Sequence, residues 1–579
     1  MTPSTLWKIS DGNPSIESCL AGELGISAIM SRVLVNRGIT SAEDAKKFLF
    51  PSLADLHNPF LLSDMERGVE RVADAVVKNE LIAIFGDYDV DGITSTAILC
   101  DFFRTLGGRV IRHIPDRINE GYGLNKKTID FFKSRGVSLV VTVDCGISNH
   151  EEIEYASRLH MDTIVIDHHE VPDIIPAALA VINQNRKDND FPFRDLAGVG
   201  VAFNFLIALR ASLRKRGFWR HNPCPNLKKY LDLVALGTIG DLVPLIDENR
   251  IFAKIGLSVM DDGARHGIQA LKIVSGMENN GTTSESAAFR LIPRLNAAGR
   301  VGTPEDAVRL LLAENNEEAL AIALKLDQLN RERQDIEREI FMDAVKKIEA
   351  NRDLFNNNSL VLSSPQWHPG VIGIVASKLV DRYYRPVLLI SLKNGIGRGS
   401  GRSIAEFNLY EGLESACSSL LLAFGGHRYA VGVTVKEEDI VELASRFAEE
   451  VKRNVGDECP VAPINVDGEC SLHEIDYPVL SQLEMLAPFG NMNPEPFFCA
   501  RHVKVTSHTV VGTGHLRLTV NDKGVEHECI WFNMGHLYGT IDKDPIDIVF
   551  TPQINRWRGG ASIQLKIHDA RHSEQPHFP

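Results

Sequence analysis

The sequence predicts an α/β protein in which a doubly wound parallel sheet domain is followed by a long connecting helix, a smaller α/β domain and a C-terminal β-barrel. Short apolar runs alternate with helical segments from Leu81 to about Ile246, a pattern typical of a mostly parallel sheet covered by helices. A continuous helical pattern covers Asn315 to Ala350, and short alternating strands follow Pro463. With 579 residues the chain exceeds the size of a single hydrophobic core, so we expect several domains.

Residues 1–75 are predicted to form a helical lead-in. An amphipathic pattern runs from Ala42 to Leu49 and is broken at Pro51, as expected for a short helix. This segment shows no pattern that suggests chemistry.

The first α/β domain is predicted over residues 76–313. Its expected strands are Ile82 to Phe85, Val110 to Ile114, Val137 to Val143, Thr163 to Ile166 and Ala178 to Ile182. Residues 314–352 form the connecting helix, which carries one apolar stripe on an otherwise charged rod. The stripe consists of Ile322, Leu326, Leu329, Ile336 and Ile340. We interpret this rod as a spacer between domains.

A second α/β domain is predicted over residues 353–457. From residue 458 to residue 579 the pattern changes to short alternating strands, such as His515 to Val520 and Ser562 to Ile567. This pattern favours a small β-barrel as the C-terminal domain.

The composition excludes several classes of protein. No stretch approaches the roughly 18 uninterrupted apolar residues of a membrane helix, and the N-terminus lacks the basic and apolar regions of a secretory signal. Nine cysteines without a Cys-x-x-Cys pair argue against a disulfide framework and a thiolate zinc site, which fits a reducing cytoplasm. A net charge of −14 argues against a protein that coats nucleic acid with its whole surface, but it is compatible with a local basic channel.

Acidic residues follow three of the predicted strands. Asp87, Asp89 and Asp91 come after the first strand, Asp144 after the third, and Asp167-His168-His169 after the fourth. The carboxyl ends of parallel strands meet at one edge of the sheet, where ligands bind in open α/β folds. Carboxylates clustered in this way repel one another and persist where cations neutralise them. The sequence therefore predicts a divalent-metal site at this edge.

A two-metal site that acts on phosphate esters needs several carboxylates and commonly a histidine. The predicted ligands for two Mn²⁺ or Mg²⁺ ions are Asp89, Asp91, Asp144, His168 and Asp241. A single Asp after a strand can instead cap a helix, and for Asp241 an N-cap is an equal alternative. A calcium-binding EF-loop is disfavoured, because the bidentate Glu that should end the loop is missing and Leu99 stands near its place.

Four segments resemble the motifs of the DHH phosphoesterase superfamily. They are Asp87 to Gly92, Val143 to Gly146, Asp167 to Glu170 and Gly240-Asp241, in this order. The resemblance implies a DHH-type sheet domain whose metal ligands are the five residues named above. It also implies that Asp87 and His169 support those ligands or take part in catalysis.

Further motifs extend the resemblance over nearly the whole chain. Gly425 to Gly432 resembles the glycine-histidine motif of the DHHA1 domain. Three other segments are similar to the bacterial RecJ family of single-strand-specific 5′-to-3′ exonucleases: Arg294 to Arg300, Trp367 to Gly373 and Pro488 to Gly490. This resemblance implies a metal-dependent exodeoxyribonuclease that hydrolyses phosphodiester bonds of single-stranded DNA in DNA repair and recombination.

The sequence departs from the family pattern at three positions. Val431 stands where a second Ala is common, Gly240 where Ala is usual, and Met492 where Gly commonly precedes Asn493-Pro494. None of these changes removes a charged or metal-binding group, so they concern local packing.

The resemblance also implies where the substrate is held. Gly397 to Ser403 offers glycines, hydroxyls and guanidiniums for a 5′-terminal phosphate, although by itself such a segment is equally a flexible hairpin turn. The implied substrate-binding residues are Arg117, Arg294, Arg300, Ser400, Arg402, Ser403 and His427. The C-terminal barrel would be an OB-fold that grips single strands, with Trp531, Phe532 and Trp557-Arg558 as candidate stacking residues that could equally belong to the core.

Two other functions remain as alternatives. One is a DHH phosphoesterase that acts on short oligonucleotides or small phosphate substrates, which would need neither the rod nor the barrel. The other is a non-catalytic DNA-binding scaffold, which has no need for the complete ligand set found here. For the exonuclease, the resemblance implies single-strand-binding protein and a helicase as partners, and we expect a monomer.

Overall fold

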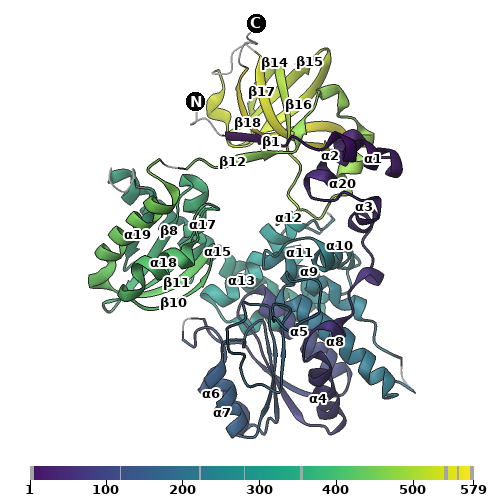
Figure 1. Cartoon of the computed structure of the whole chain (residues 1–579), viewed down its shortest axis with the longest axis vertical. Coiled ribbons are helices and arrows are strands. Elements are labelled where there is room, and N and C mark those ends of the chain that lie inside the picture. The colour runs from purple at the N-terminus through teal and green to yellow at the C-terminus, as the bar shows by residue number, and fades with distance from the viewer. Residues whose placement is uncertain are drawn as a thin grey trace. The chain divides into compact units, whose positions relative to one another are not determined.

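The computed structural model describes residues 6–117, 119–220, 223–278, 281–351, 357–458, 460–539, 545–556 and 560–573 (Figure 1). Its contacts divide the chain into two compact units. The first unit combines Met1–Leu56, Leu242–Lys254 and Ala462–Pro579, and the second combines His57–Asp241 and Ile255–Val461. The predicted five-part division of the chain stays a prediction. No helix in the described ranges is both long enough and apolar enough to cross a membrane.

The second unit contains the predicted parallel sheet. Its strand order is β3-β2-β4-β5-β6 and every pairing is parallel. The strands are β2 (Leu81–Phe85), β3 (Arg109–His113), β4 (Leu139–Val143), β5 (Asp162–Ile166) and β6 (Ala180–Ile182). The apolar runs become buried strands because helices cover both faces of the sheet. The predicted α/β architecture is therefore confirmed.

Helices on the two faces of this sheet can be followed in Figure 1. One face packs against α6 (Lys126–Ser134) and α7 (His150–Arg158), whose apolar side chains share a core with Ala83, Phe85 and Val140. The other face carries α4 (Met65–Val77), α5 (Val90–Thr105) and α8 (Gly198–Lys215), with α8 packed against both of the others. Because β2, β4 and β5 pair in parallel, their carboxyl ends lie at one edge of this sheet.

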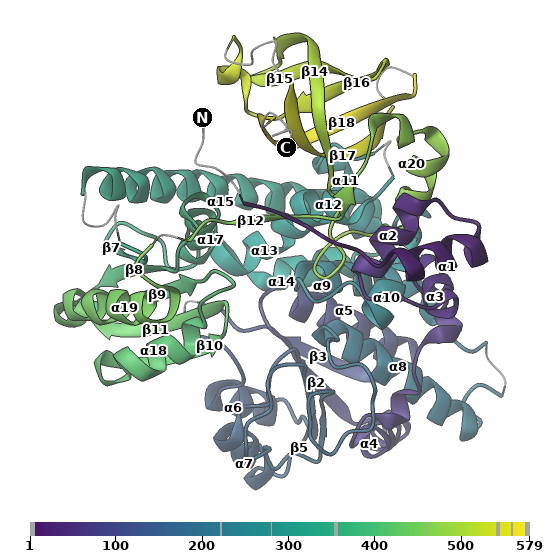
Figure 2. The same cartoon turned by 45° about the horizontal axis from the view of Figure 1, so that its top comes forward.

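Further helices of the second unit follow the sheet. They are α9 (Leu231–Gly240), α11 (His266–Val274), α12 (Ser284–Ser286), α13 (Ile292–Val301) and α14 (Pro304–Leu311), with a short π-helix, η4 (Ala287–Leu291), before α13. Another helix, α10 (Asp247–Asp261), begins in the Leu242–Lys254 segment of the first unit and ends in the second. The predicted rod is α15 (Asn316–Ala350), capped by Asn315 and seen along its length in Figure 2. Its stripe faces inwards, with Leu326 and Ile340 buried against neighbouring elements.

A second sheet in this unit has the order β10-β11-β9-β8-β7. Its strands are β7 (Leu360–Ser364), β8 (Val387–Lys393), β9 (Ile396–Arg402), β10 (Leu421–His427) and β11 (Ala430–Lys436), covered by α17 (Ile372–Tyr383), α18 (Leu409–Cys417) and α19 (Ile440–Val455). This sheet and its helices bury one continuous apolar core. The predicted smaller α/β fold is confirmed.

The glycine-rich segment in this sheet corrects one expectation. Gly397 to Ser403 was expected to be a phosphate loop or a hairpin turn, but residues up to Arg402 form β9, a central strand whose backbone pairs with both β8 and β11. A Cβ atom on Gly397, Gly399 or Gly401 would press on apolar side chains of the neighbouring strands. The glycines therefore serve close packing, and their N–H groups face the ladder and not a phosphate.

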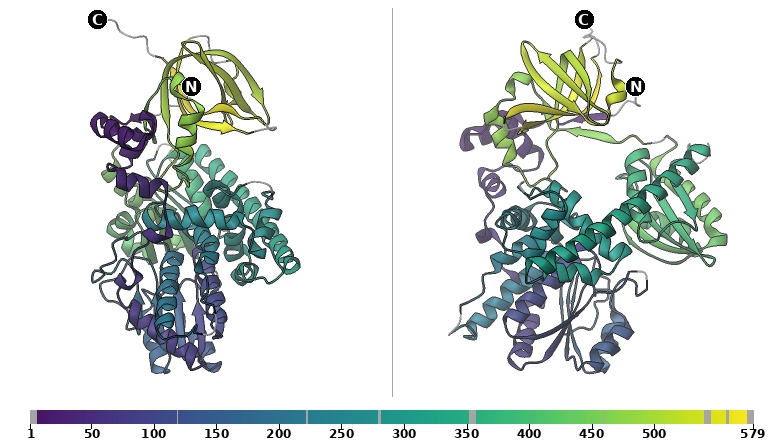
Figure 3. Two further views of the ribbon diagram at one scale, coloured as in Figure 1. Left: turned by 90° about the vertical axis from the view of Figure 1, so that its right-hand side faces the viewer. Right: turned by 180° about the vertical axis from the view of Figure 1, so that it is seen from behind.

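The first unit contains the predicted barrel (Figure 3). β14 (Phe498–Val511), β15 (His515–Asp522), β16 (Val525–Trp531), β18 (Ser562–His572) and β17 (Ile546–Asn555) pair in this order, and β17 pairs back with β14 to close the barrel. A short strand, β13 (Gly468–Glu469), and α20 (Tyr477–Glu484) precede it. The small closed barrel agrees with the expected OB-fold.

The N-terminal residues differ from the helical lead-in that was predicted. The described part of this segment contains α1 (Pro14–Leu24), α2 (Ala28–Asn36), α3 (Ala42–Leu49), which has the predicted bounds, and most of α4. Before them, however, β1 (Leu6–Ile9) pairs in parallel with β12 (Pro463–Val466). A four-residue strand whose partner lies more than 450 residues later leaves no periodic signal, so it was missed.

Candidate metal centre

Asp89 and Asp91 are placed by the turn from β2 into α5. Asp89 is the N-cap of α5, because its Oδ1 accepts hydrogen bonds from the backbone N–H groups of Asp91 (3.0 Å) and Gly92 (3.3 Å). The capping role that we considered as an alternative to metal binding is therefore real at Asp89. It uses one carboxylate oxygen and does not remove the side chain from the site.

Asp91 is fully buried and is held by the start of another helix. Its carboxylate accepts hydrogen bonds from the N–H groups of Gly198 (2.6 Å) and Val199 (2.8 Å) at the N-terminus of α8. A Cβ atom on Gly198 would lie 2.9 Å from Oδ2 of Asp91 and from Oδ1 of Asp144. Only glycine allows the helix to come this close to both carboxylates.

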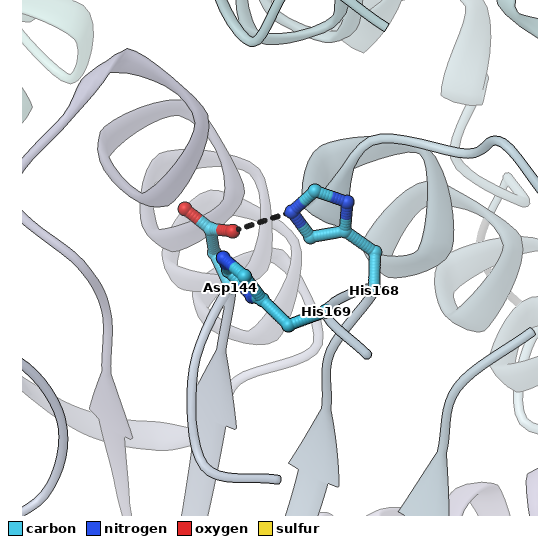
Figure 4. A group of neighbouring side chains, drawn as sticks. All are labelled: Asp144, His168 and His169. Atoms are coloured by element: carbon cyan, nitrogen blue, oxygen red, sulfur yellow. Dashed lines mark ion pairs between the residues drawn. The ribbon is translucent and has the colours of Figure 1, made fainter. Parts of the chain in front are cut away.

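His168 brings three carboxylates together. Its Nε2 lies 3.1 Å from Oδ1 of Asp144, 3.7 Å from Oδ2 of Asp241 and 3.9 Å from Oδ2 of Asp91. Figure 4 shows the imidazole of His168 directed at the Asp144 carboxylate, with His169 beside them. Asp144 holds a left-handed backbone conformation (φ 60°), which is uncommon outside glycine.

Asp241 reaches the same cluster from the end of α9. It is the C-cap residue of that helix, since its N–H donates to the carbonyl oxygen of Gly237 at 2.9 Å. The helix N-cap that was considered for Asp241 is therefore wrong. Its Oδ2 is buried, and no hydrogen bond from the described residues reaches it.

These side chains form overlapping groups in which the candidate ligand atoms lie within 4.8 Å of one another. The groups are Asp91, His168 and Asp241; Asp87, Asp89 and Asp144; and Asp144, His168 and His169. All seven predicted metal-binding or catalytic residues are thus brought together. Oδ1 of Asp87 is also buried, and the described residues offer it no hydrogen bond, which is the expected state of a ligand atom directed at a cation.

Burial and mutual repulsion disfavour the ionised forms of the carboxylates in this cluster, and a bound cation would stabilise them. Burial and the neighbouring Asp241 charge raise the pKa of Asp91 to about 7, and burial with the charge of Asp89 raises the pKa of Asp241 to about 8. The pKa values of Asp87 and Asp144 are raised by burial and by neighbouring carboxylates. Buried carboxylates with mixed histidine ligation fit Mn²⁺, and the oxygen-rich set also fits Mg²⁺.

Asp167 was predicted only as part of the Asp167-His168-His169 motif, without a role of its own. Its Oδ1 accepts from the N–H of His168 (2.8 Å) and lies 2.7 Å from Nδ1 of His169, and its Oδ2 accepts from the N–H of Ile147 (2.9 Å). Burial alone would lower the pKa of His169, but the hydrogen bond and charge of Asp167 raise it to about 9. The position of Asp167 directly before two histidines was the sequence signal that could have identified this role.

Tyr122 was also missed. Its hydroxyl lies 3.4 Å from the carbonyl oxygen of Asp144 and 3.4 Å from Nδ1 of His169, and its ring meets the His169 ring edge-on. The glycines on both sides of it, Gly121 and Gly123, have positive φ values and shape the turn that presents it.

A positively charged pocket of about 340 Å³ lies on the second sheet of this unit. On β9, the residues that alternate with the packing glycines, namely Arg398, Ser400 and Arg402, all line it, together with Arg117 and His427. None of the described residues that line it is acidic. Burial and the nearby charge of Arg117 lower the pKa of Arg402, so the pocket is suited to an anion such as a phosphate group.

The pocket and the carboxylate cluster are neighbours within the second unit. The guanidinium of Arg117 lies over the ring of Tyr88, 5.0 Å from its centroid, and Tyr88 stands between Asp87 and Asp89 in the chain. Burial and the charge of Arg117 lower the pKa of Arg300 to about 10, while Asp89 acts in the opposite direction. Cationic and anionic groups therefore face each other across a short distance.

Three predicted substrate-binding residues are not among the residues that line the pocket. Arg294 is paired with Asp327 (Nε to Oδ1, 2.9 Å), Arg300 donates to the carbonyl oxygen of Gly370 (3.2 Å), and Ser403 donates to the carbonyl oxygen of Phe407 (2.8 Å). These contacts hold local structure, and the proposed substrate roles of the three residues stay predictions.

The candidate stacking residues of the barrel differ in exposure. Trp531 is buried in the barrel core, whereas Phe532 is 46% exposed and its ring meets His515 edge-on. Trp557 and Arg558 lie outside the described residues.

Three family models match the chain. They are the DHH family N-terminal domain over residues 81–238, the DHHA1 domain over residues 356–454 and the RecJ OB domain over residues 466–569.

Several relatives are similar over most of their length. The single-stranded-DNA-specific exonuclease RecJ of Bacillus subtilis is 37% identical over 98% of this chain and 71% of the relative, and that of Escherichia coli is 36% identical over 93% and 95%. Crystal structures of Thermus thermophilus RecJ, 28% identical to this chain, match it with TM-scores of 0.84 in complex with Mn²⁺ and 0.78 in complex with Mg²⁺. The Mn²⁺ complex is matched over 99% of this chain and 81% of that one, and the Mg²⁺ complex over 98% and 79%.

Proposed function

The chain belongs to the RecJ family of single-stranded-DNA-specific exonucleases, and on this premise we propose that it is a metal-dependent hydrolase that removes nucleotides from the 5′ ends of single-stranded DNA. The observation that carries the proposal is the convergence of seven acidic and histidine side chains beside a pocket that is suited to phosphate. Hydrolysis of a phosphodiester in a strand uses both features: ligands for a divalent cation and a cationic subsite that fixes the strand.

Asp89, Asp91, Asp144, His168 and Asp241 would hold Mn²⁺ or Mg²⁺, with Asp87 close enough to Asp89 and Asp144 to join them. Two ions fit the grouping, because one group centres on Asp91, His168 and Asp241 and another on Asp87, Asp89 and Asp144. The Thermus thermophilus structures contain Mn²⁺ or Mg²⁺, which supports the same choice of metals here.

Bound metal would supply Lewis-acid stabilisation of the phosphoryl oxygens and a water of lowered pKa. The chain's own residues would supply proton transfer and would hold the strand in position. His169 is half exposed beside the cluster and keeps its proton to about pH 9 through Asp167, so it can donate a hydrogen bond to a phosphate oxygen or a proton to the departing 3′ oxygen. Asp167 holds the imidazole in place, and Arg402 with Ser400 would fix the strand end so that the scissile bond lies over the carboxylates.

Binding of the 5′ terminus in the pocket would explain why nucleotides are removed in the 5′-to-3′ direction. A 5′-phosphate presents more anionic oxygens than an internal phosphodiester, so a pocket with three arginines prefers it. Phosphate contacts carry no base information, which makes the trimming tolerant of sequence and sensitive to salt.

The wider setting belongs to the same proposal. Residues 76–313 would be the catalytic domain, residues 353–457 the substrate-binding domain and residues 458–579 a single-strand-binding OB domain. Single-strand-binding protein and a helicase are the expected partners of a cytoplasmic, monomeric enzyme of DNA repair and recombination.

Substrate competition tests the proposal. The full chain with Mn²⁺ should release nucleotides from single-stranded DNA and leave the same sequence intact as a blunt duplex, and EDTA should stop the release. Cleavage of dinucleotides alone would favour the small-substrate phosphoesterase, and strand binding without cleavage would favour the scaffold.

A further inference from the structure

Gly240, the last residue of α9, faces Val90, the first residue of α5. A Cβ atom on Gly240 would overlap Cγ1 of Val90 and would lie 3.2 Å from Cγ2 of Ile292. Carbon atoms in contact lie about 3.5–4.0 Å apart, so a methyl group at position 240 has no room beside Val90.

Both residues are joined directly to predicted metal ligands. Val90 stands between Asp89 and Asp91, and Gly240 immediately precedes Asp241. The contact between them is therefore where the first and the last metal-binding motifs of the chain touch, although the two motifs are about 150 residues apart.

Val90 has little freedom to move aside. It is 1% exposed, its N–H donates to Oδ1 of Asn296 at 2.8 Å, and its carbonyl oxygen accepts from Oγ1 of Thr94 at 2.8 Å. Its β-branched side chain has one strongly preferred rotamer in a helix. A larger residue at position 240 would therefore displace the backbone that carries the ligands.

Gly240 is confined from its own side as well. The N–H of Asp241 donates to the carbonyl oxygen of Gly237, and a Cβ atom on Gly237 would lie 2.9 Å from Oδ1 of Asp91. The last turn of α9 is thus packed tightly against the metal-binding loop at two glycines, and it cannot retreat without moving Asp241.

We propose that Val90 and Gly240 form a size-matched pair that sets the spacing between the Asp89–Asp91 loop and Asp241, and thereby the affinity of the centre for divalent metal. Both are positioning residues, because they act through the ligands beside them. The inference rests on the proposed metal-dependent function and adds to it a determinant of metal affinity outside the ligand set.

Direct titration of the full chain with Mn²⁺ in a calorimeter, without DNA, tests the pair. Gly240→Ala should raise the Kd for Mn²⁺ by about 10-fold to 100-fold, the usual cost of disturbing residues behind metal ligands. Val90→Ala should raise the Kd for Mn²⁺ less, because this substitution removes side-chain atoms and displaces no neighbouring group. The double variant Val90→Ala/Gly240→Ala should bind Mn²⁺ more tightly than Gly240→Ala alone, since the smaller residue at 90 makes room for the methyl group.

Gly22→Ala is the matched control. A Cβ atom on Gly22, in α1, meets nothing within 4 Å, so this variant should bind Mn²⁺ as the natural chain does. If Gly240→Ala fails to fold, recovery of folding and of Mn²⁺ binding in the double variant supports the pair in the same way.

Two results would overturn the inference: an unchanged Kd in Gly240→Ala, or a double variant that is no better than Gly240→Ala in folding or in Mn²⁺ binding. Absence of Mn²⁺ binding by the natural chain would instead remove the proposed function itself, and the inference with it. The titration therefore separates the two failures.

Discussion

Oδ1 of Asp167 lies 2.7 Å from Nδ1 of His169, and the same oxygen accepts the backbone N–H of His168. One buried carboxylate therefore fixes both histidines at the end of β5: it orients the ring of one and the backbone of the other. Because Asp167 is fully buried and satisfied by N–H donors, it is a permanent anion beside the carboxylate cluster. It keeps His169 protonated where an exposed histidine would already be neutral.

Asp167→Asn tests this relationship. Removing the negative charge should lower the pKa of His169 from about 9 by about one unit or more, because an adjacent opposite charge commonly accounts for that much. NMR titration of the imidazole in the metal-free protein measures it. The control is Asp130→Asn, which removes the charge of a carboxylate that accepts a hydrogen bond from the hydroxyl of Tyr155. An unchanged pKa would show that Asp167 does not govern His169.

The metal-free protein should become less stable as the pH rises from about 4 to about 8. Asp91 and Asp241 have pKa values of about 7 and about 8 in the folded protein against 3.8 as model groups, so the folded state holds protons that the unfolded chain releases. Their contribution to stability is therefore complete below pH 4 and is lost as the pH passes through the folded values. Thermal unfolding in EDTA at pH 6 and pH 9 measures the trend.

Asp241→Asn should flatten this dependence, because its side chain no longer titrates, and Mn²⁺ should then stabilise the variant less than the natural chain. A melting temperature in EDTA that rises between pH 6 and pH 9 would show that the cluster is not the source of the pH effect.

Asp144→Asn should abolish cleavage while leaving strand binding intact. Asp144 belongs to one of the two candidate metal groups, and its Oδ1 lies 3.1 Å from Nε2 of His168, which belongs to the other, so its loss should disturb both positions. We expect turnover to fall by about a thousandfold or more, which corresponds to about 4 kcal/mol of lost transition-state stabilisation. Turnover and equilibrium binding to a fluorescent oligonucleotide give the two readouts.

Asp173→Asn is the control for that experiment, because its side chain is fully exposed in the loop after β5. Comparable loss of strand binding in Asp144→Asn would mean that the carboxylate supports the fold and not the chemistry.

Arg402→Ala should weaken the preference for a 5′-phosphate. Arg402 lines the cationic pocket, and a charged hydrogen bond contributes about 1.5–3 kcal/mol, so KM for a 5′-phosphorylated strand should rise by about 10-fold to 100-fold. KM for the 5′-hydroxyl strand should change little. Lys393→Ala removes a cation from the end of the neighbouring strand β8 outside the pocket and should alter neither. Equal effects on both strands would place the 5′ end elsewhere.

Much of the centre could be predicted from the sequence, because parallel strands make its geometry simple. Asp87 and Asp144 follow apolar runs that could only be buried strands, and the ends of such strands share one edge. Asp241 was predicted as a ligand with a helix N-cap as an equal alternative, and its role as a helix C-cap could not be foreseen because α9 is apolar all round and shows no periodic stripe.

Other features depend on contacts that no local pattern records. Leu242–Lys254 groups with the two ends of the chain, where the guanidinium of Arg250 donates to the carbonyl oxygens of Phe48, Met485, Leu486 and Ala487. The glycine-rich segment that forms β9 was expected to be a loop because glycine is rare in strands. Close packing, such as that of Gly399 against Val433, explains why this strand contains glycine.

A digestion time course most directly tests the central claim, which is metal-dependent trimming from the 5′ end. The substrate is a single-stranded oligonucleotide with a 5′-phosphate and a label at its 3′ end, incubated with Mn²⁺ or with EDTA. We expect a ladder of progressively shorter labelled strands that appears with Mn²⁺ and is absent with EDTA. Immediate release of the labelled 3′ nucleotide from a strand of otherwise full length, or a ladder that persists in EDTA, would contradict it.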